Sequence, residues 1–255
     1  MIPKVIHYCW FGRNPLPKSA VKCIDSWRKL MPDYEIKEWN EDNFDVNLIP
    51  FTAEAYSVRK YAFVSDFARF WILYHYGGVY FDTDVEVIRP IDDIVEKGAY
   101  MGIEVICKVY PESLIDYPMV NPGLGVGAPA GMEFYKKMID FYSNYHFLRK
   151  DGSIIGGTVV YHTTNMLVKE GLQKRADMQQ VSGIWIYPED YFNPFDDLTG
   201  RLNKTERTYT IHWYSRSWQR KQSAFRLWLS RMSHRVFGLA LFKLKKKLNL
   251  ISWRM

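Results

Sequence analysis

The chain has 255 residues, of which 47% are hydrophobic and 16% aromatic, enough for one large globular domain with a substantial core. Its net charge of +6 is uneven, because residues 216–255 contain eleven Lys or Arg and no acid, whereas residues 1–215 carry 23 basic and 28 acidic side chains. A mildly acidic body argues against a nucleic-acid-binding domain, and three scattered cysteines argue against a disulfide framework or zinc site. We expect a reduced, cytosolic protein with no signal peptide and no spanning helix, since no apolar run is long enough for either.

Strand and helix patterns alternate at the start of the chain. Residues 3–11 read as a buried strand, 19–30 as an amphipathic helix and 34–39 as a second strand. This order and spacing predict a parallel crossover unit, and therefore an α/β fold. Trp10 ends the first strand, where it is either a core residue or an aromatic that stacks on a nucleotide base.

A long helix is predicted over residues 53–76. Asp66 and Arg69 share one face of it, three residues apart, among aromatic neighbours such as Phe63 and Phe67. Such neighbours favour a partly buried ion pair over a solvated one. A buried pair needs further partners, and sugar hydroxyls are suitable ones.

The glycine pair after that helix introduces a short apolar strand, Val79-Tyr80-Phe81, which ends in Asp82 and Asp84. Residues two apart on an extended chain point the same way, so both carboxylates are expected to meet one cation. Oxygen ligands suit Mg²⁺ or Mn²⁺, and in open α/β sheets ligands bind at the carboxyl ends of strands. An isolated Asp-x-Asp triplet is more typical of a solvated turn, but the buried strand before this one favours a site.

The rest of the body continues in strands and helices. Residues 85–88 and 99–105 read as strands, 92–96 as a short helix or turn, and 132–146 as a helix. The Gly- and Pro-rich stretch 118–129 is either a close approach of backbone to a ligand or a strand flanked by turns. Near the end of the body, His212 lies in an alternating aromatic strand, where it is either a core residue, a phosphate partner or a third metal ligand.

The tail, residues 225–255, combines an apolar stripe with basic residues. A basic amphipathic helix with Trp and Phe is typical of a segment that lies flat on an anionic membrane. The alternative is a helix that packs on the body and presents a solvated basic face. We favour the membrane because no acidic residue balances the charge.

Five blocks of sequence, taken in order, closely resemble glycosyltransferase family 32, which includes bacterial polysaccharide enzymes and yeast mannosyltransferases. The Asp-x-Asp block is also similar to that of the large clostridial glucosylating toxins. The resemblance covers roughly residues 2–218 and excludes the tail. The blocks are Ile6–Gly12 (IHYCWFG), Tyr34–Asn40 (YEIKEWN), Ala62–Arg69 (AFVSDFAR), Gly77–Asp84 (GGVYFDTD) and Ile211–Trp213 (IHW).

The resemblance implies a GT-A fold, with a Rossmann-like, mainly parallel sheet flanked by helices over residues 1–218. The basic amphipathic tail over 219–255 is a separate expectation from composition and lies outside the resemblance. The resemblance also implies that Asp84 binds a divalent metal directly, Asp82 reaches the metal shell and the donor, and His212 is the least secure metal ligand. Other roles carried over by position are Tyr80 beside the ribose, Asp66 and Arg69 on donor-sugar hydroxyls, Trp10 on the base, and Ser217 and Trp218 in a lid over the diphosphate.

The sequence therefore predicts a metal-dependent retaining glycosyltransferase, with Asp66, Arg69, Asp82 and Asp84 as its catalytic residues and Mn²⁺ or Mg²⁺ as its cofactor. The toxin-like Trp10 and Tyr80 favour a UDP-sugar donor. The expected acceptor is a lipid-linked saccharide at the inner face of the cell membrane, in capsular, exopolysaccharide or O-antigen synthesis. Two alternatives remain open: a metal-dependent nucleotidyltransferase or phosphohydrolase, and a catalytically inactive membrane-binding module.

Overall fold

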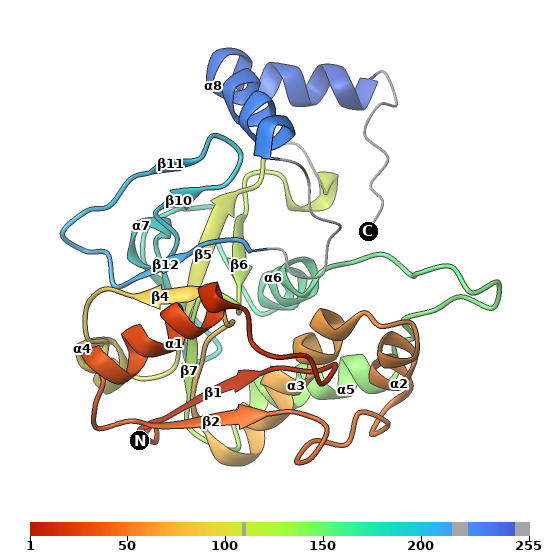
Figure 1. Cartoon of the computed structure of the whole chain (residues 1–255), viewed down its shortest axis with the longest axis vertical. Coiled ribbons are helices and arrows are strands. Elements are labelled where there is room, and N and C mark those ends of the chain that lie inside the picture. The colour runs from red at the N-terminus through yellow and green to blue at the C-terminus, as the bar shows by residue number, and fades with distance from the viewer. Residues whose placement is uncertain (109–110, 216–223, 248–255) are drawn as a thin grey trace.

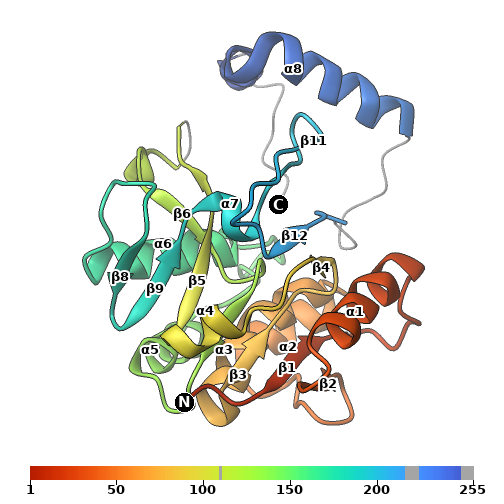
Figure 2. The same ribbon diagram turned by 90° about the vertical axis from the view of Figure 1, so that its left-hand side faces the viewer.

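A computed structural model describes residues 1–108, 111–215 and 224–247 of the chain, and in the last segment it describes the side chains of residues 226–238 (Figure 1). The described part forms a central eight-stranded sheet covered by helices on both faces (Figures 1 and 2). The strands of this sheet are β1 (Val5–Cys9), β2 (Glu35–Trp39), β3 (Gly78–Tyr80), β5 (Tyr100–Ile106), β6 (Pro118–Asn121), β7 (Val126–Ala128), β8 (Gln179–Val181) and β9 (Ile184–Tyr187).

The sheet is mixed but mainly parallel, as expected. The strand order is β2-β1-β3-β7-β5-β9-β8, with β6 beside β5. Strands β1, β2 and β3 pair in parallel, β7 is antiparallel to both β3 and β5, and β9 is parallel to β5. Strands β2, β1, β3, β5 and β9 therefore share one direction, which brings the carboxyl ends of β1, β2 and β3 to one edge.

Helices cover both faces of the sheet (Figure 2). Side chains alternate between two cores: Val79 and Phe81 pack with Ile24 and Trp27 on one face, whereas Tyr80 packs with the helices on the other. The helices are α1 (Lys18–Leu30), α2 (Pro50–Ser57), α3 (Tyr61–Tyr76), α4 (Asp92–Lys97), α5 (Glu133–Ser143), α6 (Val159–Lys169), α7 (Glu189–Phe192) and α8 (Ala224–Lys247), with a 3-10 turn at Glu112–Leu114.

The prediction of one long helix over residues 53–76 is wrong in one respect, because the structure divides this segment into α2 and α3. Arg59, between the two helices, has a φ of 59°, a left-handed conformation that an α-helix does not contain. The amide of Lys60 bonds the carbonyl of Ala55 at 2.8 Å, which closes the end of α2. Helix α3 can consequently take its own direction across the sheet.

Two small strand pairs lie outside the central sheet. Strand β4 (Val85–Val87) pairs antiparallel with β12 (Thr210–His212), and β10 (Phe195–Asp196) pairs with β11 (Arg201–Leu202) in a hairpin (Figure 1). Helix α8 lies over this hairpin and is kinked at Gly238. Among the described residues, no helix combines the length and the hydropathy that crossing a bilayer requires.

Candidate active site

Gly77 and Gly78 turn the chain from α3 into β3 and so deliver the two acids to the sheet edge. Both have positive φ, 66° and 106°, and a Cβ on Gly78 would lie 2.7 Å from the Val5 carbonyl. The turn is fixed by His7, whose Nε2 donates to the carbonyl of Gly77 at 2.9 Å while its Nδ1 accepts from the indole of Trp39 at 3.1 Å. Burial lowers the pKa of His7 to about 4, so the ring is neutral at pH 7.

The two acids lie in the turn between β3 and β4. The amide of Val85 bonds the carbonyl of Asp82 at 3.0 Å, so residues 82–85 form a turn. The expectation that alternation along an extended strand aligns Asp82 and Asp84 is therefore wrong. The turn itself brings their side chains together.

His212 joins these acids from the far end of the chain. Strand β12 pairs with β4 so that His212 lies opposite Val85, and His212 Nε2 is 3.1 Å from Asp84 Oδ1. Ligand atoms of Asp82, Asp84 and His212 lie within 4.8 Å of one another, a group that could hold a metal ion. The sequence left His212 open between core residue and ligand, and the structure places it in both environments, buried and beside the acids.

The two acids of this group differ in electrostatic environment. Burial alone would raise the pKa of Asp84, but the neighbouring His212 and the amide of Ser215, which donates to Asp84 Oδ2 at 2.7 Å, hold it well below its usual range. Burial raises the pKa of Asp82, an effect that Arg69 partly offsets. Asp84 is therefore the carboxylate that stays ionised under all ordinary conditions.

Asp66 and Arg69 form the second part of the site, and the pair is buried as expected. Arg69 is 3% exposed, and its Nη2 lies 3.0 Å from Asp66 Oδ1 and 3.3 Å from Asp82 Oδ1. The guanidinium lies over the ring of Tyr80, 4.9 Å from its centroid. Burial raises the pKa of Asp66 to about 7 despite Arg69, so this carboxyl can donate or accept a hydrogen bond near neutral pH.

Tyr80 lies in the core next to the acids, and its place beside a ribose stays a prediction. It is 1% exposed in the core, and its hydroxyl donates to Asp82 Oδ1 at 3.1 Å. Its physical role in this structure is to hold the Asp82 carboxylate.

Trp10 borders a separate cavity of about 300 Å³ near the ends of β1 and β2. The cavity is also lined by Asn14, Glu38, Asn40 and Asp42, and the Trp10 indole donates to the carbonyl of Asn14 at 2.6 Å. Trp10 is half-buried, so part of its ring is available to a ligand. The two lid residues expected from the sequence, Ser217 and Trp218, lie outside the described residues.

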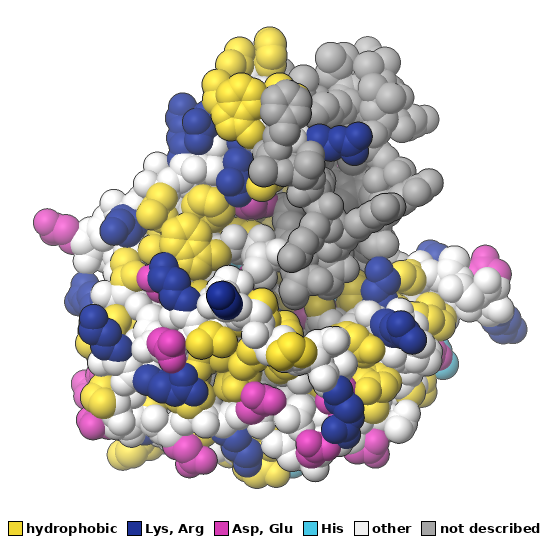
Figure 3. All heavy atoms as spheres, in the orientation of Figure 1, with side chains coloured by type: hydrophobic (Ala, Val, Ile, Leu, Met, Phe, Trp, Pro, Cys, Tyr) yellow, Lys and Arg dark blue, Asp and Glu magenta, His cyan; other side chains and the backbone are white. Residues whose placement is uncertain are grey.

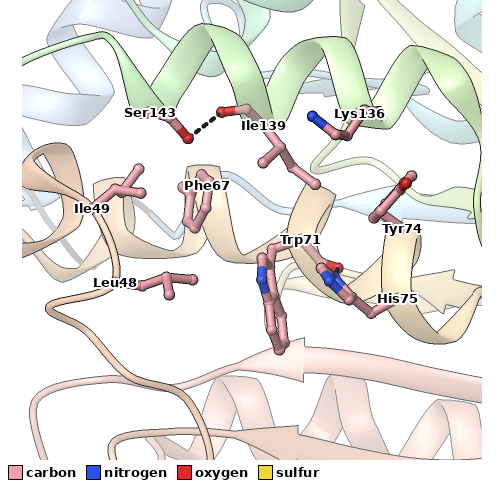
Figure 4. A pocket seen from close by; sticks show the side chains of 9 residues that line it. All are labelled: Leu48, Ile49, Phe67, Trp71, Tyr74, His75, Lys136, Ile139 and Ser143. Carbon is pink, nitrogen blue, oxygen red and sulfur yellow. Dashed lines mark hydrogen bonds between the residues drawn. The ribbon is translucent and has the colours of Figure 1, made fainter.

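Another cavity of about 300 Å³ lies away from the acids, between α3 and α5 (Figure 4). Its lining is mostly apolar, with Phe67 and Trp71 from α3 and Ile139 from α5, and no carboxylate lines it. Carboxylate oxygens that could bind a cation lie at the acidic edge of the sheet instead.

Sequence reasoning missed two contacts that hold Asp84. The amide of Ser215 binds its carboxylate, and the amide of Trp213 donates to its carbonyl at 3.0 Å. The Trp213 indole donates to Glu86 Oε2 at 2.8 Å, which fixes the end of β12 against β4. Backbone donors carry no residue-type signal, so only the polar stretch after His212 hinted at them.

Residues 17–101 match the family model described as "Glycosyltransferase sugar-binding region containing DXD motif". This stretch is similar to the sugar-binding region of DXD glycosyltransferases. Its Asp-x-Asp motif is Asp82-Thr83-Asp84, at the site described above, and the resemblance read from the sequence is confirmed.

Several known proteins are similar to this chain. Inositol phosphoceramide mannosyltransferase 3 of Schizosaccharomyces pombe is 28% identical over 198 residues, which are 74% of this chain and 51% of the relative. The chain thus spans about half the length of that relative. Two solved structures resemble the chain with TM-scores of 0.46: the PaToxG glycosyltransferase (21% identity, 67% of this chain and 70% of the other) and the galactosyltransferase LgtC (13% identity, 90% and 95%). Both the family model and this relative are glycosyltransferases by their descriptions.

Proposed function

We propose that this chain transfers a hexose from a nucleotide-sugar donor to a saccharide acceptor, with a divalent cation and with retention at the anomeric carbon. The observation that carries the proposal is the meeting of Asp82, Asp84 and His212, from segments more than 120 residues apart, next to the buried Asp66 and Arg69. A solvated acidic turn would not recruit a distant imidazole and a buried guanidinium.

The donor set fits a divalent cation. Carboxylate oxygens suit Mn²⁺ and Mg²⁺, and the low pKa of Asp84 keeps one of them ionised. Nδ1 of His212 is buried without a hydrogen-bond partner among the described residues, so the polar contact of this ring is made by Nε2, on the side of Asp84. When bound, such a cation neutralises charge on the departing diphosphate.

The buried pair next to the acids would orient the donor sugar. Arg69 Nη1 is buried and has no hydrogen-bond partner among the described residues, and Asp66 has a pKa of about 7. A sugar with several hydroxyls satisfies both groups, since each hydroxyl can donate and accept. Trp10 would stack on the base, and UDP is our proposed nucleotide; the name of the yeast relative favours mannose among the hexoses.

Retention is what the family resemblance implies, and the contacts of the acids bear on how it would be achieved. Arg69 contacts Asp66 and Asp82, and His212 and Ser215 contact Asp84, so none of the three carboxylates is left as a free nucleophile. We propose attack from the face that the leaving group occupies. The acceptor oxygen bonds to the anomeric carbon as the bond from that carbon to the diphosphate breaks, and the hydroxyl proton passes to the diphosphate.

We further propose that residues 1–218 form the catalytic domain and that residues 219–255 attach it to the inner face of the cell membrane, near a lipid-linked acceptor. The described apolar side chains of α8 are exposed, with Val236 at 68%, and they form a yellow patch flanked by basic residues (Figure 3). Such a face suits an anionic bilayer surface. A capsular, exopolysaccharide or O-antigen pathway would supply the acceptor.

Two arginines of α8 contact the body of the protein. Arg231 lies 3.3 Å from Asp197 and its guanidinium lies over Phe195, while Arg235 Nε donates to the carbonyl of Thr199 at 2.7 Å. These two arginines therefore hold α8 on the β10–β11 hairpin. Attraction to anionic lipid would have to come from the other basic residues of the tail.

The test is hydrolysis and transfer with a panel of nucleotide sugars and Mn²⁺, with the released nucleotide identified. Release of nucleoside diphosphate supports the proposal, whereas monophosphate or pyrophosphate indicates a nucleotidyltransferase or phosphohydrolase. Asp84→Ala should abolish turnover, and Asp25→Ala, which removes an exposed helix carboxylate paired with Arg28, should not. Full activity of Asp84→Ala would refute the role given to the cation site, and vesicle binding with no turnover on any donor would favour an inactive module.

A further inference from the structure

The turn between β6 and β7 lies against the Asp82 carboxylate. Gly123 is buried in this turn, its carbonyl accepts the amide of Asp82 at 3.3 Å, and its own amide donates to Asn121 Oδ1 at 2.7 Å. Asn121, itself buried, therefore closes the turn from inside. From the sequence, this Gly-rich stretch was either a ligand contact or a strand flanked by turns. In the structure, Gly123 contacts Asp82, an acid of the proposed cation site.

Space explains why residue 123 is glycine. A Cβ built on Gly123 would lie well under 3.0 Å from Asp82 Oδ2, a separation that real Cβ atoms essentially never show. Gly123 does not have a positive φ, unlike Gly125 two residues later at 137°, so its backbone does not itself require glycine. The missing side chain therefore leaves room for a carboxylate oxygen.

The two oxygens of Asp82 are fixed from opposite directions. Oδ1 accepts the Tyr80 hydroxyl at 3.1 Å and lies 3.3 Å from Arg69 Nη2, while Oδ2 lies in the space beside Gly123. Rotation of the carboxylate would break the first set of contacts or collide with the second. Asp82 is thus held in one orientation before any ligand arrives.

We propose that Gly123 is a positioning residue for cation binding, which acts by holding the Asp82 carboxylate in the orientation that the cation site requires. This inference rests on the proposed function. A methyl group at position 123 forces Asp82 to move while the charges, the metal-ligand residues and the backbone conformation stay the same. Supporting groups of this kind typically contribute 10- to 100-fold to metal affinity.

The test uses the full-length protein and Mn²⁺ alone, with affinity measured by calorimetry or by the EPR signal of free Mn²⁺. Gly123→Ala should bind Mn²⁺ about 10- to 100-fold more weakly than the unaltered protein. Gly127→Ala is the matched control, because its Cβ would also fall under 3.0 Å from a side chain, here the Tyr100 ring, and its φ is not positive either. That variant should retain Mn²⁺ affinity within about 2-fold even where it loses stability.

A second readout separates positioning from a general structural defect. Gly123→Ala should lower the free energy of unfolding more in the unaltered protein than in an Asp82→Ala background, where the Asp82 oxygen is absent and only the contact with Asn121 Oδ1 at 3.0 Å remains. An equal loss in both backgrounds, or unchanged Mn²⁺ affinity of Gly123→Ala, would overturn the inference.

Two further outcomes are informative. If Gly123→Ala does not fold, Asn121→Ala loosens the same turn without adding an atom, and normal Mn²⁺ affinity in that variant would overturn the inference. If the unaltered protein binds no Mn²⁺, the proposed function fails and this inference falls with it, a result distinct from a defect confined to one variant.

Discussion

Replacing Arg69 by methionine should destabilise the protein far more than the same change at Arg28. Both arginines pair with an aspartate three residues earlier on a helix, at 3.0 Å for Asp66 and Arg69 and at 2.8 Å for Asp25 and Arg28. Methionine and arginine have similar helix propensities, so neither substitution should change the stability of its helix through the backbone. The two variants then differ mainly in burial and in the number of partners lost.

The expected magnitudes follow from that burial. The side chains of Arg69 and Asp66 are 3% and 13% exposed, and Arg69 also contacts Asp82. Loss of Arg69 therefore leaves the carboxylates of Asp66 and Asp82 without the guanidinium that pairs with them. Breaking a buried pair in this way costs about 3 to 5 kcal/mol, a large part of a typical total of about 5 to 15 kcal/mol. The Arg28 pair has both side chains about 60% exposed and should contribute about 0 to 0.5 kcal/mol.

The assay is urea unfolding followed by circular dichroism, for both variants and the unaltered protein under one set of conditions. Arg69→Met should shift the midpoint strongly, and Arg28→Met should leave it nearly unchanged. Equal shifts of the two unfolding midpoints would mean that Arg69 does not pair with buried charge. That result would contradict the role proposed for Asp66 and Arg69 in orienting the donor sugar.

Three other measurements probe separate parts of the molecule. His7 has a folded pKa of about 4, below the usual 6.5, so the stability it contributes is present above pH 6.5 and is lost as the pH falls towards 4, by up to about 3 kcal/mol. In urea unfolding at several pH values, the stability of His7→Gln should therefore depend less steeply on pH in the acid range than that of the unaltered protein. Parallel curves of stability against pH would contradict this. His212→Asn should weaken Mn²⁺ binding by at least about 10-fold in calorimetry, and unchanged affinity would remove it from the ligand set. The pair Leu229→Glu and Val236→Glu, at exposed positions of α8, should reduce sedimentation with anionic vesicles while donor hydrolysis persists, and undiminished binding would disprove the membrane role of that face.

Much of the fold was predictable because local pattern and packing agree. The strand, helix and second strand over residues 5–39 follow directly from hydrophobic periodicity, and their parallel pairing is observed. The break at Arg59 was not predictable, because a left-handed arginine carries no composition signal and the apolar residues run on through it. The backbone bonds that close α2 there, such as that from Lys60 to Ala55, are open to any residue type.

The site was predictable in its residue types and less so in its geometry. Asp82, Asp84, Asp66 and Arg69 were all named from the sequence, and the structure gathers them. The turn that aligns the acids depends on backbone bonds, and the space beside Gly123 depends on a contact across 41 residues. Neither can be read from spacing along the chain.

The pairing of β4 with β12 has a consequence for biosynthesis. A nascent polypeptide that has emerged only as far as the DXD region already holds both acids but lacks the imidazole of His212 and the amide of Ser215 that complete the cluster. Strand β12 must leave the ribosome before Asp82, Asp84 and His212 can come together, so a truncated translation product would contain the recognisable motif without the assembled cluster.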